Sequence, residues 1–172
     1  MKTTLYTFIL LSFLTFFFFN CEKGNEEVKN VDITGSLKNH TVCKTELKSG
    51  YEAIILVDTL SKVDYSYNLE NKKLTLNHIN AGFNCCFDSL YCNIQHTKDS
   101  ILIEEVELNP HCKCDCLYDL HIEINNVAEG TYQIKFIEPN VGKMEKIIFE
   151  LDLKNEKTGY FCIIRKQYPW GQ

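Results

Sequence analysis

Apolar and polar residues alternate with a period of two along much of the chain. Between Val63 and His78 the apolar residues take every second position on either side of Asn71-Lys72, and this predicts two strands joined by a turn. Runs of the same kind cover residues 53–57, 101–108, 114–124, 131–137, 146–153 and 160–164. No segment keeps helical spacing for long. About eight short strands predict an all-β fold, an antiparallel β-sandwich, with an open barrel as the alternative.

One junction between predicted strands favours the sandwich. Gly130 permits a tight return of the chain, and the hydroxyl of Tyr132 can reach back to an upstream backbone group. Residues 120–136 resemble the corner before a late strand in immunoglobulin-like and fibronectin-like sandwiches. The resemblance implies an immunoglobulin-like fold in one domain, residues 31–172, and it implies nothing about function.

The N-terminal region has the composition of a signal peptide. Residues 1–20 carry a single charge, Lys2, and residues 5–19 are mostly apolar. As a helix, that apolar stretch would be about 22 Å long, short of the ~30 Å hydrocarbon core of a bilayer, so a spanning helix is the weaker interpretation.

The end of this leader, Phe18-Phe19-Asn20-Cys21, resembles the lipobox of bacterial lipoprotein precursors, with Asn20 where that family prefers a small residue. The resemblance implies that Cys21 becomes the first residue of the mature protein and carries acyl chains, several of which would anchor it stably in a membrane. Residues 21–30 form a polar, lipidated tether. Its acidic residues resemble the sorting signal of surface-exposed lipoproteins, although a solvated linker explains them equally well.

We therefore expect a location in the cell envelope, lipid-anchored to the outer membrane on its periplasmic or surface face. Removal of residues 1–20 leaves 172 − 20 = 152 residues and a charge of 17 − 23 = −6. This acidic balance, without any basic run, disfavours nucleic acid as a partner. The membrane is the one partner that the sequence indicates, and no protein or glycan partner is specified. Trp170 could stack on a sugar, but a tail packed over the sandwich edge is the simpler interpretation.

Eight cysteines follow Cys21, an even number in a chain that we expect to be exported, and this predicts disulfides. They are Cys43, Cys85, Cys86, Cys92, Cys112, Cys114, Cys116 and Cys162.

The spacing of the last clustered cysteines limits how they can pair. Cys112, Cys114 and Cys116 share the alternation of the apolar residues that follow, so one continuous strand would bury all three sulfurs. Residues two apart on a strand are ~6.6 Å apart with parallel side chains, which disfavours bonds among them. The favoured grouping among 105 connectivities joins these three to Cys85, Cys86 and Cys92, with a bend near Gly82 and Asn84, and joins Cys43 to Cys162.

The alternative for the same residues is a zinc or copper(I) site. Its ligands would be Cys85, Cys86, Cys92, Cys112, Cys114, Cys116 and His111. The Cys-x-Cys-x-Cys and Cys-Cys spacings differ from the paired Cys-x₂-Cys of zinc knuckles, and an oxidising compartment favours disulfides. We therefore expect no cofactor.

Catalysis has little support in the sequence. Cys92 and His96 are the nearest nucleophile and base, but proximity in a β segment supplies no orienting third group. The Glu104-Glu105 pair would face opposite ways on a strand, as solvated charges. No hydrolase, phosphate-loop or metalloprotease motif is present. The sequence thus predicts a non-catalytic binding or structural module, with a metal-binding lipoprotein as the alternative.

Overall fold

The strands of the protein pack as two facing sheets. The computed structural model describes residues 32–44 and 60–166, and in these the regular elements are nine strands. Their bounds are β1 (Thr34–His40), β2 (Leu60–Asn68), β3 (Lys73–Asn84), β4 (Ser89–Thr97), β5 (Ser100–Leu108), β6 (Asp115–Asn125), β7 (Thr131–Ile137), β8 (Ile148–Asp152) and β9 (Thr158–Ile164).

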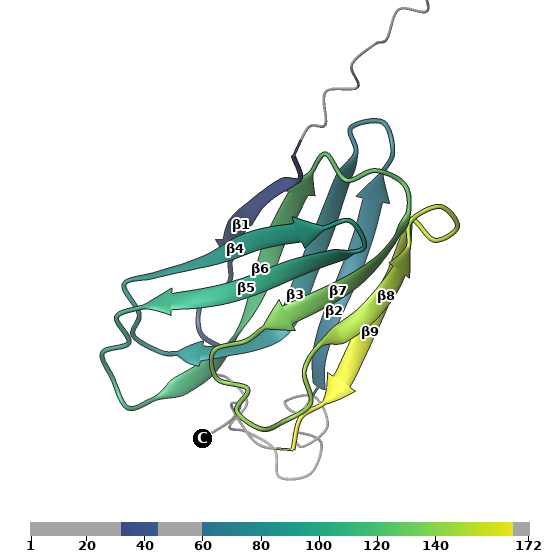
Figure 1. Cartoon of the computed structure of the whole chain (residues 1–172). Coiled ribbons are helices and arrows are strands. Elements are labelled where there is room, and N and C mark those ends of the chain that lie inside the picture. Colours follow the sequence, from purple (N-terminus) through teal and green to yellow (C-terminus); the bar gives the residue numbers. More distant parts are fainter. Residues whose placement is uncertain (1–31, 45–59, 167–172) are drawn as a thin grey trace, which may run out of the picture. The chain divides into compact units, whose positions relative to one another are not determined.

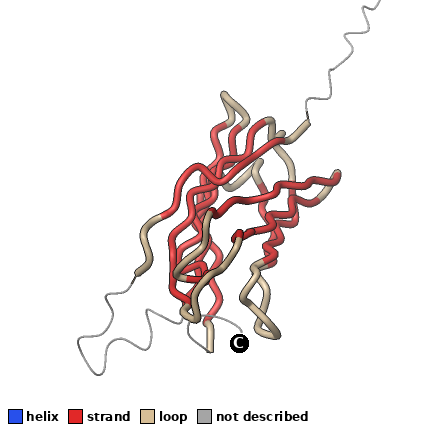
Figure 2. The backbone as a smooth tube through the Cα atoms, turned by 90° about the vertical axis from the view of Figure 1, so that its left-hand side faces the viewer, coloured by secondary structure: helices blue, strands red, loops and turns tan. Residues whose placement is uncertain are grey.

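The described strands form sheet A, with the order β1-β6-β3-β2-β9, and sheet B, with the order β4-β5-β7-β8 (Figure 1). A view turned by 90° shows the two layers edge on (Figure 2). Neighbouring strands pair antiparallel, except that β5 pairs parallel with β7. The chain can make that parallel pair because β6, which lies between β5 and β7 in sequence, crosses to sheet A.

The core lies between the sheets and follows from the alternation of the strands. Every second residue of β3 and β6 points inward, and these side chains meet the inward residues of β5 and β7. The most completely buried apolar side chains, each 0% exposed, include Leu74, Leu76, Ile101, Ile103, Leu120, Ile122, Ile124 and Ile134. The alternating faces of both sheets therefore build one continuous apolar layer.

The structure confirms the predicted all-β, disulfide-stapled sandwich. Of the predicted strands, the six described ones that begin near residues 63, 74, 101, 114, 131 and 160 match β2, β3, β5, β6, β7 and β9, and residues 146–153 contain β8. Residues 53–57 lie outside the described part. Two strands were not predicted, β1 and β4, and both are edge strands.

The predicted corner at the start of β7 is also confirmed. The Tyr132 hydroxyl donates a 3.1 Å hydrogen bond to the carbonyl oxygen of Ala128. The Tyr67 hydroxyl donates a second bond, 2.8 Å long, to the carbonyl of Val127. Asn126 takes a φ of 64°, a left-handed conformation that Asn tolerates better than most residues. Two tyrosines thus fix the turn from β6 to β7.

The predictions for the termini fall outside the described residues. These are the signal peptide at 1–20, the tether at 21–30 with Cys21, and the tail that contains Trp170. Within 32–44 and 60–166, no helix is long and apolar enough to cross a membrane.

Candidate functional site

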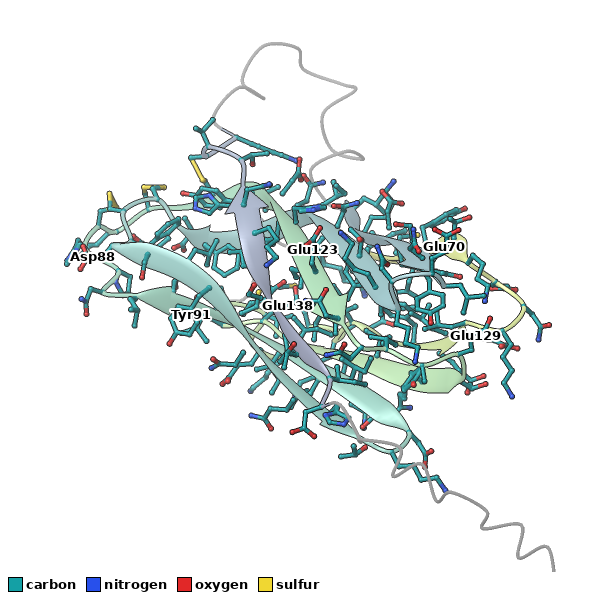
Figure 3. All side chains as sticks on the ribbon, turned by 90° about the horizontal axis from the view of Figure 1, so that it is seen from above. Glu70, Asp88, Tyr91, Glu123, Glu129 and Glu138 are labelled. Carbon is teal, nitrogen blue, oxygen red and sulfur yellow. A yellow bond between two sulfur atoms is a disulfide. The ribbon has the colours of Figure 1, made fainter. Side chains whose placement is uncertain are left out.

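Six cysteines form three disulfides at one end of the sandwich, within the described residues. The bonds are Cys43–Cys116, Cys85–Cys114 and Cys86–Cys112, with Cα–Cα distances of 5.8, 5.6 and 5.7 Å. The bridges are adjacent: Cys112 Sγ lies 3.7 Å from Cys114 Sγ, and the sulfurs of Cys43 and Cys116 lie within 4.8 Å of that of Cys85. We call these six residues the disulfide cluster; its sulfurs lie at the same end as Asp88 (Figure 3).

Asn84, the last residue of β3, organises the chain around the disulfide cluster. Its side-chain amide donates to the carbonyl of Cys112 at 2.6 Å, and its Oδ1 accepts from the backbone N–H of Cys86 at 2.9 Å. Its own backbone N–H donates to Glu107 at 2.7 Å. The Cys85 N–H donates to the Cys114 carbonyl at 2.9 Å, so the β3–β6 pairing continues past the strand ends. The predicted bend at Asn84 is therefore real, and a side chain stabilises it.

Aromatic and charged side chains surround this end of the sandwich. The Tyr118 ring lies 5.4 Å from that of Phe87 and 5.9 Å from the imidazole of His40. On the exposed side, Asp88 accepts from Asn109 at 2.9 Å and lies 2.8 Å from His111 Nε2. These hydrogen bonds lower the pKa of Asp88 below its usual value. This end of the sandwich thus has packed aromatic rings and, on its exposed side, hydrogen-bonded polar side chains.

The predicted grouping was right for Cys85, Cys86, Cys112 and Cys114 and wrong for the other four cysteines. Cys85 and Cys86 do pair with the group at 112–116, but Cys43 takes Cys116, so Cys92 and Cys162 are free thiols. A Cys43–Cys162 bond is geometrically excluded, because the Cα atom of Cys43 lies 5.8 Å from that of Cys116 on β6, whereas Cys162 is on β9, three strand spacings or ~14 Å from β6.

The predicted burial of three sulfurs on one strand was also wrong. The strand begins only at Asp115, so Cys116 alone is buried by it, while Cys112 and Cys114 lie in the preceding loop and are partly or fully exposed.

The metal alternative loses its ligands in this arrangement. Five of its seven residues are bonded in disulfides, which offer no thiolate. Cys92 lies in the core, and the His111 imidazole contacts Asp88. The sulfurs of Cys86, Cys112 and Cys114 lie within 4.8 Å of one another, as do those of Cys43, Cys85 and Cys116. Only reduction of the bridges would make such groups available to a metal.

A second cluster, of polar side chains, lies inside the core. Ser61 Oγ is 2.9 Å from His78 Nε2, and His78 Nδ1 is 2.6 Å from Glu105 Oε1. The three residues come from β2, β3 and β5 and are 0%, 0% and 3% exposed. The hydrogen bond between His78 and Glu105 therefore joins the two sheets through the apolar layer.

An ion pair adjoins this group. Arg165 donates two hydrogen bonds to the carboxylate of Glu138, at 2.5 and 2.6 Å, and another from its Nη1 to the Glu145 carbonyl at 2.5 Å. Arg165 is 1% and Glu138 6% exposed. Together with Ser61, His78 and Glu105, these two residues form what we call the core polar network.

The network changes how its members bind protons. Burial alone would lower the pKa of His78, but the attraction and hydrogen bond of Glu105, aided by Glu138, outweigh it and the pKa is raised, with Arg165 opposing. Burial and the charge of Glu105 raise the pKa of Glu138, while His78 and Arg165 act in the opposite direction. With His78 protonated, two cations balance two carboxylates, which is how buried charges are tolerated.

Ser61, His78 and Glu105 are connected by hydrogen bonds in the order serine, histidine, carboxylate, as in a hydrolase triad. They differ from such a triad in that a substrate has no access to the serine. A nucleophilic serine must reach a substrate carbonyl, and Ser61 is 0% exposed. The other candidate nucleophile, Cys92, is buried too. Burial, reinforced by the Glu105 charge, raises the pKa of its thiol well above the usual value, so it stays protonated. In this arrangement the polar network links the sheets and presents no reactive group to solvent.

A third feature is a hollow on the outer face of sheet A. One residue from each strand lies directly opposite its neighbour across the sheet, and the row runs Asn39, His121, Asn77, Asp64, Tyr160. We call this the cross-strand row. Its first four residues, with Thr41 and Asp119, line a hollow of about 350 Å³.

Sequence reasoning missed the core polar network and the hollow. One signal was available for the network, since Glu105 continues the inward alternation of Ile101 and Ile103, yet it was interpreted as a solvated charge. Glu104 and Glu105 do face opposite ways, as predicted, but Glu105 is buried. The hollow depends on strand order, which alternation does not specify.

Comparisons with known protein families, with curated proteins and with solved structures find no match to this chain.

Proposed function

We propose that this protein is an exported, lipid-anchored β-sandwich that acts by binding or as a structural module, without catalysis. The observation that carries the proposal is the disulfide cluster. Of the eight cysteines after Cys21, six are bonded, and disulfides persist in oxidising compartments outside the cytosol. The signal-like residues 1–20 and the lipobox-like Cys21 supply a route to that compartment and an anchor there.

The absence of catalysis in the proposal follows from burial. Within the described residues, Ser61, which contacts the base His78, and the thiol of Cys92 lie in the core, whereas the exposed thiol of Cys162 has no base among its hydrogen-bond partners. The hydrogen bonds and charges of the buried groups join the sheets. What the molecule offers to solvent is a rigid surface on a covalently stapled frame, and such a frame suits recognition.

Two measurements test the proposal. Intact mass under non-reducing conditions, after thiol alkylation in denaturant, should show three bridges, with Cys92 and Cys162 as the free thiols among the cysteines that follow Cys21. Several more free thiols together with stoichiometric zinc or copper would instead favour the metal-binding lipoprotein.

The anchor is tested by fractionation. The Cys21→Ala variant should leave the membrane fraction, whereas the matched Cys162→Ser variant should remain in it. Retention of Cys21→Ala in the membrane would refute the lipid anchor at this residue.

A further inference from the structure

We propose that the cross-strand row on the outer face of sheet A binds a short neutral oligosaccharide. The inference rests on the proposed binding function and names its ligand class. It comes from three properties of this surface: its hydrogen-bonding groups, its charge balance and its length.

The hydrogen-bonding groups suit hydroxyls. Carboxylates, amides and an imidazole can each accept or donate to a sugar hydroxyl. His121 Nδ1 lies 2.7 Å from Asn77 Oδ1, which fixes the orientation of both side chains. The Nδ2 groups of Asn77 and Asn39 have no hydrogen-bond acceptor within the described part of the chain, so these donors are available to a ligand. Thr41 Oγ1 accepts from the Asp119 N–H at 2.9 Å and holds the floor of the hollow in place.

The charges at the hollow are already balanced. Asp119 pairs with Lys44 at 2.5 Å, and Asp64 pairs with Lys62 at 2.9 Å. Two residues beyond His121 on β6, outside the hollow, Glu123 pairs with Lys73 at 2.8 Å and lies 3.8 Å from His121 Nε2. A surface with paired charges gains little from an ionic ligand, because binding an ion would require one of these pairs to open. An uncharged, hydroxyl-rich ligand fits without that cost.

An aromatic ring ends the row. Tyr160 is 69% exposed and lies opposite Asp64 in the β2–β9 register. An exposed tyrosine offers an apolar face for the C–H side of a sugar ring and a hydroxyl at its rim. Lys62 Nζ lies over one face of this ring, 5.9 Å from its centre. The row therefore combines a stacking surface with polar groups, as an amphipathic sugar requires.

The length of the row sets the size of the ligand. It crosses the five strands of sheet A, or four spacings of ~4.8 Å, about 19 Å in all. That length accommodates several linked sugar rings, so an oligosaccharide should bind more tightly than a monosaccharide.

The test uses the full-length mature chain, purified in a detergent without a sugar head group. Cellotetraose, maltotetraose and N-acetylchitotetraose are titrated by calorimetry and by ¹H–¹⁵N chemical shifts, with glucose as the length control and a galacturonate tetramer as the anionic control. At least one neutral tetrasaccharide should bind and shift the amides of the cross-strand row. The Tyr160→Ala and Asn77→Ala variants should each weaken binding about fivefold or more.

Tyr91→Ala is the matched control, since Tyr91 is a partly exposed tyrosine on β4 of the other sheet, and it should leave affinity unchanged. The proposal is overturned if no neutral tetrasaccharide binds, if the anionic tetramer binds more tightly, or if the shifts map to sheet B. Such a result would leave the lipid anchor intact, because membrane fractionation of Cys21→Ala reports on the anchor independently.

Discussion

The guanidinium of Arg165 holds the carboxylate of Glu138 with two hydrogen bonds, 2.5 and 2.6 Å long, inside the protein. Arg165 directly follows β9 of sheet A and Glu138 directly follows β7 of sheet B, so the pair ties the two layers together. A buried pair of this kind stabilises less than its geometry suggests, because both charges lose their hydration.

We expect the loss of one partner of the Arg165–Glu138 pair to lower the free energy of unfolding more than the loss of both. Glu138→Gln should lower the free energy of unfolding by about 3–5 kcal/mol, since it leaves the Arg165 charge buried. The double variant Glu138→Leu with Arg165→Met should recover much of that loss. Urea denaturation of the single variants Glu138→Leu and Arg165→Met and of their double variant measures the coupling, and strictly additive losses would contradict it.

Stability should fall as the pH rises above about 6.5. The pKa of His78 is raised in the folded protein, so the folded state binds its proton more tightly than the unfolded state does. The contribution of His78 to the free energy of unfolding is fully present at pH values below its pKa in the unfolded state, about 6.5. It is lost as the pH rises through the pKa of the folded state. The raised pKa of Glu138 also makes stability fall as the pH rises. Its effect begins at a lower pH, because the pKa of a glutamate in the unfolded state is lower than that of a histidine.

Thermal melts across this range check the expectation. The exposed His96→Gln variant should keep the pH dependence, whereas His78→Gln should flatten it and lower the melting temperature at every pH. A melting temperature of the unaltered protein that rises from pH 6.5 to 9 would show that His78 is not held as a cation.

Removal of the Tyr132 hydroxyl should lower the stability of the fold by a moderate amount. Tyr132→Phe deletes the 3.1 Å hydrogen bond to Ala128 and should lower the free energy of unfolding by about 1 kcal/mol. Tyr91→Phe, on the exposed side of β4, serves as control and should change it by less than about 0.5 kcal/mol. Equal losses in the two variants would mean that the corner hydrogen bond does not stabilise the β6–β7 turn.

The two free thiols should react at very different rates. Cys162 is exposed on β9, while Cys92 is 7% exposed and its thiol has a strongly raised pKa. Iodoacetamide at neutral pH should label Cys162 in the native protein and should reach Cys92 only in denaturant. Peptide mapping of the labelled cysteines distinguishes the two, and rapid native labelling of Cys92 would indicate that β4 opens easily.

Alternation of apolar and polar residues was enough to predict the central strands, and it failed where a strand covers little core. β1 and β4 each pair with one neighbour at a sheet edge and leave most of their side chains at least partly exposed. Their sequences consequently carry a weak period-two signal. The Gly130–Tyr132 junction was recognisable because its hydrogen bond is local, four residues along the chain.

The cysteine pairing and the buried charges depend on strand order. Cys43 reaches Cys116 because β1 pairs with β6, and nothing in the spacing of the cysteines specifies that neighbour. Likewise, Glu105 becomes buried beside His78 only once β5 is packed over β3. Non-local contacts of this kind are what a single sequence leaves open.

The order of the strands also determines when the fold can form. The chain passes between sheets A and B after β3, β5, β6 and β8, and the last strand, β9, pairs with the second, β2. Neither layer is contiguous in sequence. Sheet B has all its strands once β8 has been synthesised, but sheet A cannot be completed before β9, the last described strand, has been synthesised. Such long-range closure is slow compared with local hairpin formation. The sandwich is therefore closed only when β9 pairs with β2, which joins the last described strand to the start of the second one.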